Sequence, residues 1–387
     1  MKKKKNKHNY SQEIAALDKY YQQALELVKN QSFTEFDEEI KTCLDIFVQK
    51  RETNKSLIQV IITCLIKKII TPDQDIRLHK AGFANGYNAR GLDEEVTTPF
   101  FKSKFTKYAN KGTAFLTLSL RPAIIWNFED GKQLRIRPKE LVIPFLQLID
   151  KIENQTIDIE NCLVYILLQL HLLCQSQAET FTETIELASS KNILNINTVM
   201  KMVERHFAEP SSSRLPVIVI FAIYEQLLKT VRRFENKILL PLNVHTSADK
   251  HGYGDIEIRD NDNNPFEILE IKHNIPIDRN MILDIEKKSA NTTIERYYIL
   301  TTYKDCFPNK DEEEYINELI LKIKRERGLE IIANGIVNTL KCYLRFIEDY
   351  HEFIKTYTEE LVKDAKNSTE VKDSHIQAWQ IILQKYI

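Results

Sequence analysis

The sequence predicts a helix-rich α+β fold, in which a mixed sheet core flanked by helices follows a largely helical N-terminal region. Glycine and proline are scarce, with 9 and 11 residues in 387, whereas Leu, Ile, Lys and Glu are abundant. This composition favours helices over most of the chain. Short apolar runs bounded by turn-forming residues lie between residues 238 and 301, and these runs predict the strands.

Three parts are expected along the chain. Apolar positions three and four residues apart predict helices in the N-terminal part, from Ile14 onward. Amphipathic helices return near the C-terminal end, where we expect them to pack on the core. The predicted parts are a helical N-terminal region (1–210), a core (211–310) and C-terminal helices (311–387).

Composition limits the classes of protein to which this chain can belong. Its formal net charge of −1 argues against general coating of nucleic acid, so any DNA contact has to come from a local basic patch. The longest apolar candidate for a membrane span, Cys162 to Cys174, is interrupted by Gln169 and His171. The six cysteines form no CxxC pair and are expected to be reduced. We therefore expect a cytoplasmic protein without a membrane partner.

The core has a distinct order of elements, which is helix, three strands, helix, strand. Turn-forming residues from Asp260 to Asn264 join the second and third strands, as in a hairpin. The expected bounds are a helix at Leu215 to Phe234, strands at Ile238 to Val244, Asp255 to Arg259 and Phe266 to His273, a helix from Pro276 to about Ala290, and a strand at Tyr297 to Thr301.

The hairpin carries the residues that suggest chemistry. Glu270 and Lys272 are two apart on one predicted strand and therefore share a face, and Asp255 opens the strand before it. Two carboxylates at one end of a sheet suit Mg²⁺, with water, phosphate and the carbonyl of Ile271 as further ligands. A lysine beside them can orient a water and stabilise charge that develops on a phosphate. The alternative is a surface hairpin in which Glu270 and Lys272 form an ordinary ion pair.

With these motifs in place, the chain resembles the PD-(D/E)XK nuclease superfamily, and in particular type II restriction endonucleases. The resemblance rests on the segment from Thr246 to Asp255, on Glu270-Ile-Lys272, and on the order of the elements. It implies Mg²⁺-dependent hydrolysis of DNA, with Asp255 and Glu270 as metal ligands and Lys272 as the residue that orients water. Family members often carry another glutamate on the preceding helix, and Glu225 matches that position; the alternative is a helix-surface glutamate.

The chain departs from the family pattern at one position, and it also resembles one group within the family. Gly254 stands where the family pattern has proline, which lowers the specificity of the match. The helical first half, the Pro99-Phe-Phe segment and the late core are loosely similar to the SacI group of restriction enzymes. A homodimer acting on double-stranded DNA, with a companion DNA methyltransferase, is then expected. A repair or structure-specific nuclease and a non-catalytic DNA-binding protein are the alternatives.

Residues 76–122 are the predicted DNA-reading segment, because glycines, asparagines and basic side chains interrupt the helical pattern there. From residue 77 to 121 there are eight basic residues against the three acids at positions 93–95. The alternative is a solvated loop with scattered charges. Candidates for phosphate contacts are Lys102, Lys104 and Lys107; candidates for base contacts are Asn85, Asn88 and Arg90; Arg77 and Lys80 complete the predicted set.

Several polar residues near the proposed site receive lesser roles. His245, His251 and His273 have neither zinc-site nor HNH spacing and are expected around the site rather than in it. Glu267 should face away from Glu270, because the two are three residues apart on one strand. Asp249 replaces Asp255 only if the register of the hairpin differs.

Overall fold

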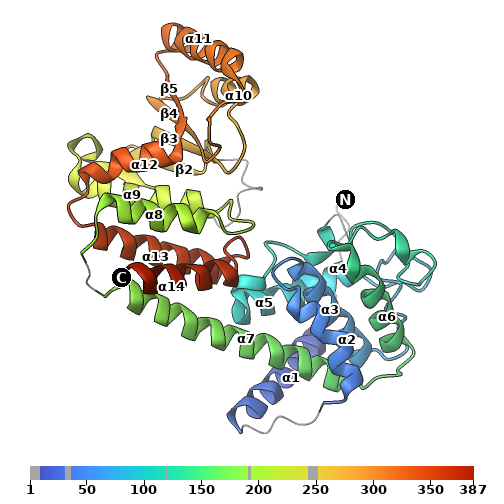
Figure 1. Ribbon diagram of the computed structural model, residues 1–387. Coiled ribbons are helices and arrows are strands. Elements are labelled where there is room, and N and C mark those ends of the chain that lie inside the picture. Colours follow the sequence, from blue (N-terminus) through green and yellow to red (C-terminus); the bar gives the residue numbers. More distant parts are fainter. Residues whose placement is uncertain (1–8, 31–35, 118–119, 191–192, 243–251) are drawn as a thin grey trace. The chain divides into compact units, whose positions relative to one another are not determined.

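The computed structural model describes residues 9–30, 36–117, 120–190, 193–242 and 252–387, and Figure 1 shows their elements. The chain divides into two compact units, Met1–Ala178 and Glu179–Ile387. The first unit is helical, and the second combines helices with a five-stranded sheet. The predicted helix-rich α+β class is therefore confirmed.

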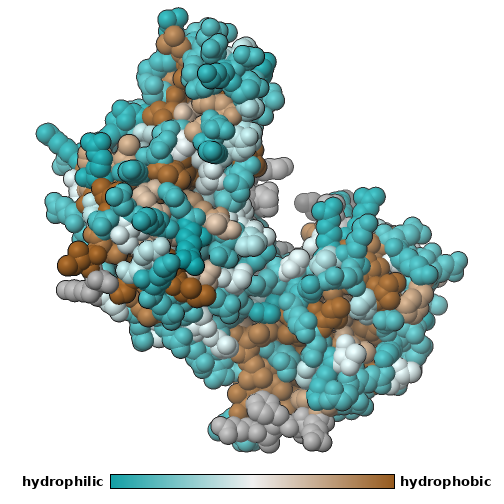
Figure 2. All heavy atoms as spheres, in the orientation of Figure 1, coloured by the Kyte–Doolittle hydropathy of each residue, from teal (hydrophilic) through white to brown (hydrophobic). Residues whose placement is uncertain are grey.

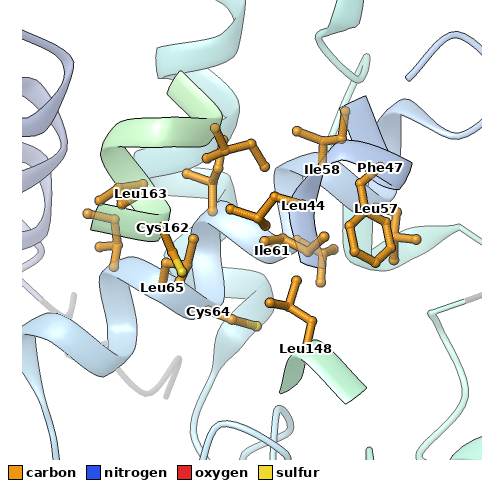
Figure 3. Packing of buried hydrophobic residues seen from close by; sticks show 14 of the residues in the cluster. Leu44, Phe47, Leu57, Ile58, Ile61, Cys64, Leu65, Leu148, Cys162 and Leu163 are labelled. Atoms are coloured by element: carbon orange, nitrogen blue, oxygen red, sulfur yellow. The ribbon is translucent and has the colours of Figure 1, made fainter. Parts of the chain in front are cut away.

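The first unit is built around one helix, α3 (Lys55–Ile70), most of whose side chains are buried. Its helices are α1 (Ser11–Lys29), α2 (Glu38–Gln49), α3 (Lys55–Ile70), α4 (Ala89–Leu92), α5 (Thr98–Lys104), α6 (Val142–Glu153) and α7 (Ile159–Ala188), the last of which continues into the second unit. Ten of the sixteen residues of α3 are apolar, and such a helix is stable when protein surrounds it. Figure 3 shows α3 residues such as Ile61 and Leu65 packed among side chains of α2, α6 and α7.

The predicted DNA-reading segment is more regular than its composition suggests. A π-helical turn (Asp93–Thr97) joins α4 to α5, so residues 89–104 are helical throughout. The Asp93 carboxylate is buried and accepts hydrogen bonds from Gln59 Nε2 at 2.7 Å and from the Ala114 N–H at 2.8 Å. Gly86 is required by a tight turn, since a Cβ there would lie 2.0 Å from the Lys80 carbonyl oxygen. Much of the unusual composition thus serves the fold.

The second unit contains the sheet and the remaining helices. The helices are α8 (Ile196–Phe207), α9 (Leu215–Thr230), α10 (Arg279–Lys288), α11 (Lys310–Arg327), α12 (Ile336–Tyr343), α13 (Tyr350–Asn367) and α14 (Asp373–Tyr386). The strands are β1 (Lys237–Leu239), β2 (Ile256–Asp260), β3 (Pro265–Lys272), β4 (Arg296–Thr301) and β5 (Glu330–Gly335). The predicted order of helix, three strands, helix and strand is present.

The sheet is mixed, with the strand order β1-β2-β3-β4-β5. The pairs β1–β2 and β2–β3 are antiparallel, whereas β3–β4 and β4–β5 are parallel, with α10 and α11 as the crossover helices. Alternate residues of β3 enter two cores: Ile268 packs with residues of α10 and α11, and Leu269 packs with residues of α9, α12 and α13. Figure 1 shows the sheet between these helices, and in Figure 2 the outer surface of α10 and α11 is largely hydrophilic.

Two boundaries differ from the sequence prediction. The division between units falls after Ala178 rather than at 210, because Val199, Met202 and Val203 of α8 pack in the core of the second unit. The sheet also continues past residue 310, since β5 pairs with β4. The proposed core is therefore larger than the predicted 211–310.

Helix α7 is the one described helix that is long and apolar enough to cross a membrane by length and composition, and 44% of that stretch is buried within the protein. Its residues from Cys162 to Leu168 lie in the first core, as in the core helix of a soluble protein. All six cysteines are free. Cys64 and Cys162 are buried, whereas Cys342 is exposed.

Candidate active site

The hairpin of β2 and β3 brings the predicted acids together. Ile256 pairs with Leu269 in antiparallel register, so the next pair toward the end of the hairpin is Asp255 with Glu270. The Asp255 N–H donates to the Leu269 carbonyl at 2.9 Å, and its carboxylate accepts the Ile271 N–H at 2.8 Å. Because side chains alternate along strands, Asp255, Glu270 and Lys272 lie on the same face of the sheet.

Gly254 explains how Asp255 can approach β3 so closely. A Cβ at position 254 would lie 2.6 Å from Ile268 Cγ2 and 2.7 Å from the Leu269 carbonyl oxygen. Neither contact is sterically allowed, so a residue with a side chain would push this backbone away from β3. Glycine therefore stands before the aspartate here for a local packing reason.

A pocket of about 280 Å³ opens at this end of the sheet. The hairpin contributes Asp255 and the run from Glu270 to His273. Ser213, Arg214 and Val217 line it from the start of α9, and Glu370 lines it from the segment between α13 and α14. Three carboxylates and two cations thus border one cavity within the second unit.

The charges in this pocket are not balanced around Asp255. Burial, followed by the charge of Glu270, raises the pKa of Asp255 above its usual value, while the Ile271 N–H, Lys272 and Arg214 act in the opposite direction. Lys272 Nζ lies 2.6 Å from Glu270 Oε1, and both side chains are partly exposed. Added positive charge beside Asp255 would therefore stabilise its ionised form.

The donor set suits a hard cation that keeps part of its water shell. Asp255 and Glu270 provide carboxylate oxygens, and Ile271 between them also lines the pocket. Among the described residues, no three His, Cys, Asp or Glu side chains converge as a metal-binding group. Mg²⁺ fits such a site, because it commonly takes one or two protein carboxylates and completes its shell with water and phosphate.

A buried ion pair supports one wall of the pocket. Arg214 Nη2 lies 2.7 Å from Asp364 Oδ2, with both side chains almost fully buried, and this pair links the start of α9 to α13. Sequence reasoning missed both Arg214 and Glu370. Arg214 directly precedes the apolar run of α9, which is a detectable signal, whereas nothing in the local sequence of Glu370 connects it to residue 255.

His273 was expected near the site, and the structure places it in the pocket lining. Its Nε2 lies 2.9 Å from Ser212 Oγ, and its Nδ1 lies 2.9 Å from Thr302 Oγ1. Burial lowers the pKa of His273 below its ordinary value, which favours the neutral imidazole. Its position is therefore fixed from both sides of the ring.

Other predicted neighbours of the site fall elsewhere. The buried Glu267 pairs with Arg233, whose Nη2 lies 2.6 Å from Oε1, and it faces away from Glu270 as expected. The predicted residues His245, Asp249 and His251 lie outside the described residues.

The structure does not bring Glu225 into the pocket. This residue lies on α9 two turns beyond Val217, and the charged groups that act on it include Glu360 and Lys363 of α13. Burial raises the pKa of Glu225 to about 7, and the charge of Glu360 adds to this shift. The helix-surface interpretation of Glu225 therefore fits the structure better than a role as a metal ligand.

Many residues of the predicted DNA-reading set make contacts within the first unit itself. Arg77 pairs with Asp75 at 2.9 Å, and Lys80 Nζ donates to the Arg121 carbonyl. Asn85 adopts the left-handed backbone conformation with φ at 59°. Asn88 caps α4 by accepting the Gly91 N–H at 3.0 Å. These side chains and turns stabilise local structure, which the base-reading prediction did not anticipate.

The remaining basic candidates are divided between surface and interior. Lys107 is 4% exposed and lies 2.8 Å from Glu52, so its expected phosphate contact does not fit the structure. Arg90 is exposed and pairs with Glu94 at 2.8 Å. Lys102 is exposed and donates to the Lys111 carbonyl, and the exposed Lys104 lies over the Tyr21 ring. The surface members Arg90, Lys102 and Lys104 can still reach a partner.

Comparisons with known proteins add no relative. The chain matches no known protein-family model, and a search of curated protein sequences finds no significant similarity. The chemistry of the pocket therefore has to carry the functional argument.

Proposed function

We propose that this protein is a magnesium-dependent endonuclease of double-stranded DNA, on a restriction-endonuclease-like fold. The observation that carries the proposal is the convergence of Asp255, Glu270 and Lys272 on one face of the β2–β3 hairpin, at a pocket. The order of elements and the mixed sheet are compatible with the PD-(D/E)XK resemblance. Two carboxylates and an ammonium group are the residue types that hydrolysis of a phosphodiester needs.

Each residue has a defined task in this proposal. Asp255 and Glu270, with the Ile271 carbonyl, would hold Mg²⁺, which when bound supplies charge neutralisation at the phosphate and a more acidic water. Lys272 would release its contact with Glu270, hold the attacking water by hydrogen bonding, and stabilise negative charge that develops on the phosphate oxygens. The Ile271 N–H keeps the Asp255 carboxylate in place at 2.8 Å.

Within this chemistry we favour a type II restriction endonuclease over a repair or structure-specific nuclease. Such an enzyme would be cytoplasmic, would act as a homodimer on a two-fold symmetric site, and would have a companion DNA methyltransferase. The direct contact between Glu270 and Lys272, at 2.6 Å, is what a structural hairpin would also contain. That observation favours a non-catalytic DNA-binding protein as the second candidate.

The test is to incubate supercoiled plasmid DNA and Mg²⁺ with the parent protein and with Asp255→Asn and Lys272→Ala. Lys288→Ala, which removes an exposed lysine of α10, is the matched control. We expect discrete fragments from the parent and from the control, and loss of about 10²–10³ in rate for Lys272→Ala, as for removal of one group that stabilises transition-state charge.

The outcomes separate the candidates. Equal cleavage by the parent and Lys272→Ala would remove Lys272 from the mechanism, and DNA binding without cleavage would favour the non-catalytic protein. Cleavage of branched or flapped DNA, with linear duplex left intact, would replace the restriction enzyme by a structure-specific nuclease.

A further inference from the structure

A second pocket, in the first unit, is bordered by basic side chains. It has a volume of about 640 Å³ and is formed by the segment that leads into α6. Lys132, Arg135, Arg137 and Lys139 all line it, and no acidic side chain of the described residues does. The four cations lie within eight consecutive positions, just beyond the segment for which sequence reasoning predicted DNA contacts.

The backbone of this segment is fixed rather than loose. Gly131 packs against α6 so closely that a Cβ there would lie 2.4 Å from Leu146 Cδ2. The Arg137 carbonyl accepts a hydrogen bond from Asn54 Nδ2 at 2.8 Å. Leu134 and Ile136 are 5% and 1% exposed, so the arginines that follow each of them project on the solvent side.

The four cations differ from Arg77, Arg90 and Lys107 among the earlier candidates, because their charge is not already paired. Within the part of the chain that the structure describes, none of Lys132, Arg135, Arg137 and Lys139 forms an ion pair, and the adjacent Glu140 pairs with Lys50 at 2.7 Å. By contrast, Lys107 pairs with Glu52. Four exposed positive charges on an anchored backbone attract an anion strongly.

The geometry points to a phosphate-bearing polyanion as the ligand, and we propose that this pocket binds the phosphodiester backbone of duplex DNA. Guanidinium groups bind phosphate oxygens through paired hydrogen bonds, and the flanking lysines add point charges. A contact of this kind positions a duplex without reading its sequence. The choice of DNA as the polyanion rests on the proposed function, whereas the anion site itself rests on the four cations.

The test measures DNA binding by fluorescence anisotropy without Mg²⁺, so that no cleavage is needed. A labelled duplex of mixed sequence is titrated with the parent and with the double variant Arg135→Gln, Arg137→Gln, over a salt series from about 50 to 200 mM. The control is Lys19→Ala with Lys29→Ala, which removes two exposed positive charges from α1 of the same unit. Circular dichroism checks that each variant is folded.

We expect weaker binding by the arginine variant. The slope of the logarithm of the binding constant against the logarithm of the salt concentration should fall in magnitude by about 2, because two phosphate contacts are lost. The α1 variant should keep the parent slope. Equal losses in both variants would show an effect of net charge alone and overturn the inference, as would no loss in either. If the arginine variant binds the duplex as the parent does but no longer binds phosphatidylserine vesicles, the pocket binds a membrane surface. That result would also overturn the inference.

These outcomes are independent of the test of cleavage. If the parent cuts plasmid DNA and the double arginine variant binds DNA as tightly as the parent does, the proposed function stands and the inference is wrong. A parent that never cuts, but whose DNA binding depends on the two arginines, does the opposite.

Discussion

At the residue scale, Gly254 shows how strongly one position can depend on the absence of a side chain. In Gly254→Ala the added methyl group would overlap Ile268 and the Leu269 carbonyl, so the backbone of Asp255 should move away from β3. We expect a loss of about 1–3 kcal/mol in the free energy of unfolding, as for other overpacked sites, and weaker Mg²⁺ binding by calorimetry. Gly112→Ala is the control, because its Cβ would meet nothing within 4 Å. Parent-like stability of Gly254→Ala would contradict this account.

Glu225 should influence stability rather than catalysis. Its pKa is raised from 4.5 to about 7 by burial, so between these pH values the folded protein binds more protons than the unfolded chain. The residue therefore lowers the free energy of unfolding as pH rises through this window. In Glu225→Gln that loss should disappear, so the variant should exceed the parent in stability above pH 7 in urea titrations. Loss of plasmid cleavage in this variant, at unchanged stability, would instead return Glu225 to the catalytic set.

At the element scale, the sequence predicted what local patterns control. The apolar run of α9 and the alternation in β2 and β3 gave those elements to within a few residues. β5 was missed because it is an edge strand on which Ile331 is the one fully buried residue, so no alternation is visible. The helical run from Ala89 to Lys104 was missed because its glycine and threonine residues have low helix propensity, and burial of apolar side chains such as Leu92 and Phe101 outweighs that preference.

The same division applies to the candidate site. Asp255, Glu270 and Lys272 lie on one hairpin, so a short turn fixes their register and the sequence was sufficient to bring them together. Arg214 and Glu370 reach the pocket only through packing of α9 with α13 and of the segment after it, which no spacing in the sequence encodes. For the DNA-reading segment the sequence predicted too many contact residues, because a basic composition does not reveal which charges are already paired inside the fold.

The link between α9 and α13 leads to a prediction about Arg214 and Asp364. Asp364→Asn removes the carboxylate that lies 2.7 Å from the buried Arg214 guanidinium, and should lower the free energy of unfolding by about 3–5 kcal/mol. The double variant Arg214→Met, Asp364→Leu should recover most of this loss, because no uncompensated charge stays buried. Urea unfolding monitored by circular dichroism measures both. A double variant as unstable as the single one would show that packing, rather than charge, is responsible.

At the scale of the whole molecule, the two units have separate hydrophobic cores, and each contains one of the two tryptophans. Trp126 is buried in the first unit, and Trp379 is buried in the second, where its indole N–H donates to Thr358 Oγ1 at 2.8 Å. In Trp126→Phe the remaining Trp379 should therefore report the unfolding of the second unit. In Trp379→Phe the remaining Trp126 should report that of the first unit. We expect two fluorescence transitions with different urea midpoints, because independent cores need not unfold together.

Mg²⁺ sharpens that experiment. A ligand that binds only the folded second unit should raise the free energy of unfolding that Trp379 reports, by about 2.7 kcal/mol at a ligand concentration 100 times its Kd. The free energy of unfolding that Trp126 reports should not change. Ca²⁺ and Na⁺ at matched ionic strength distinguish site binding from screening. Coincident transitions for the two tryptophans, or an equal Mg²⁺ shift of both, would argue against units that behave independently.

The position of Glu370 in the pocket has a consequence for how the protein is made. The pocket is bordered by residues from Ser213 to Glu370, so its last wall is not synthesised until long after the hairpin with Asp255 and Glu270. A chain still growing on the ribosome therefore carries an unfinished cavity until Glu370 has been added. For an enzyme that cuts DNA, such late completion would delay the hazard to the cell's own chromosome until the segment with Glu370 has been made.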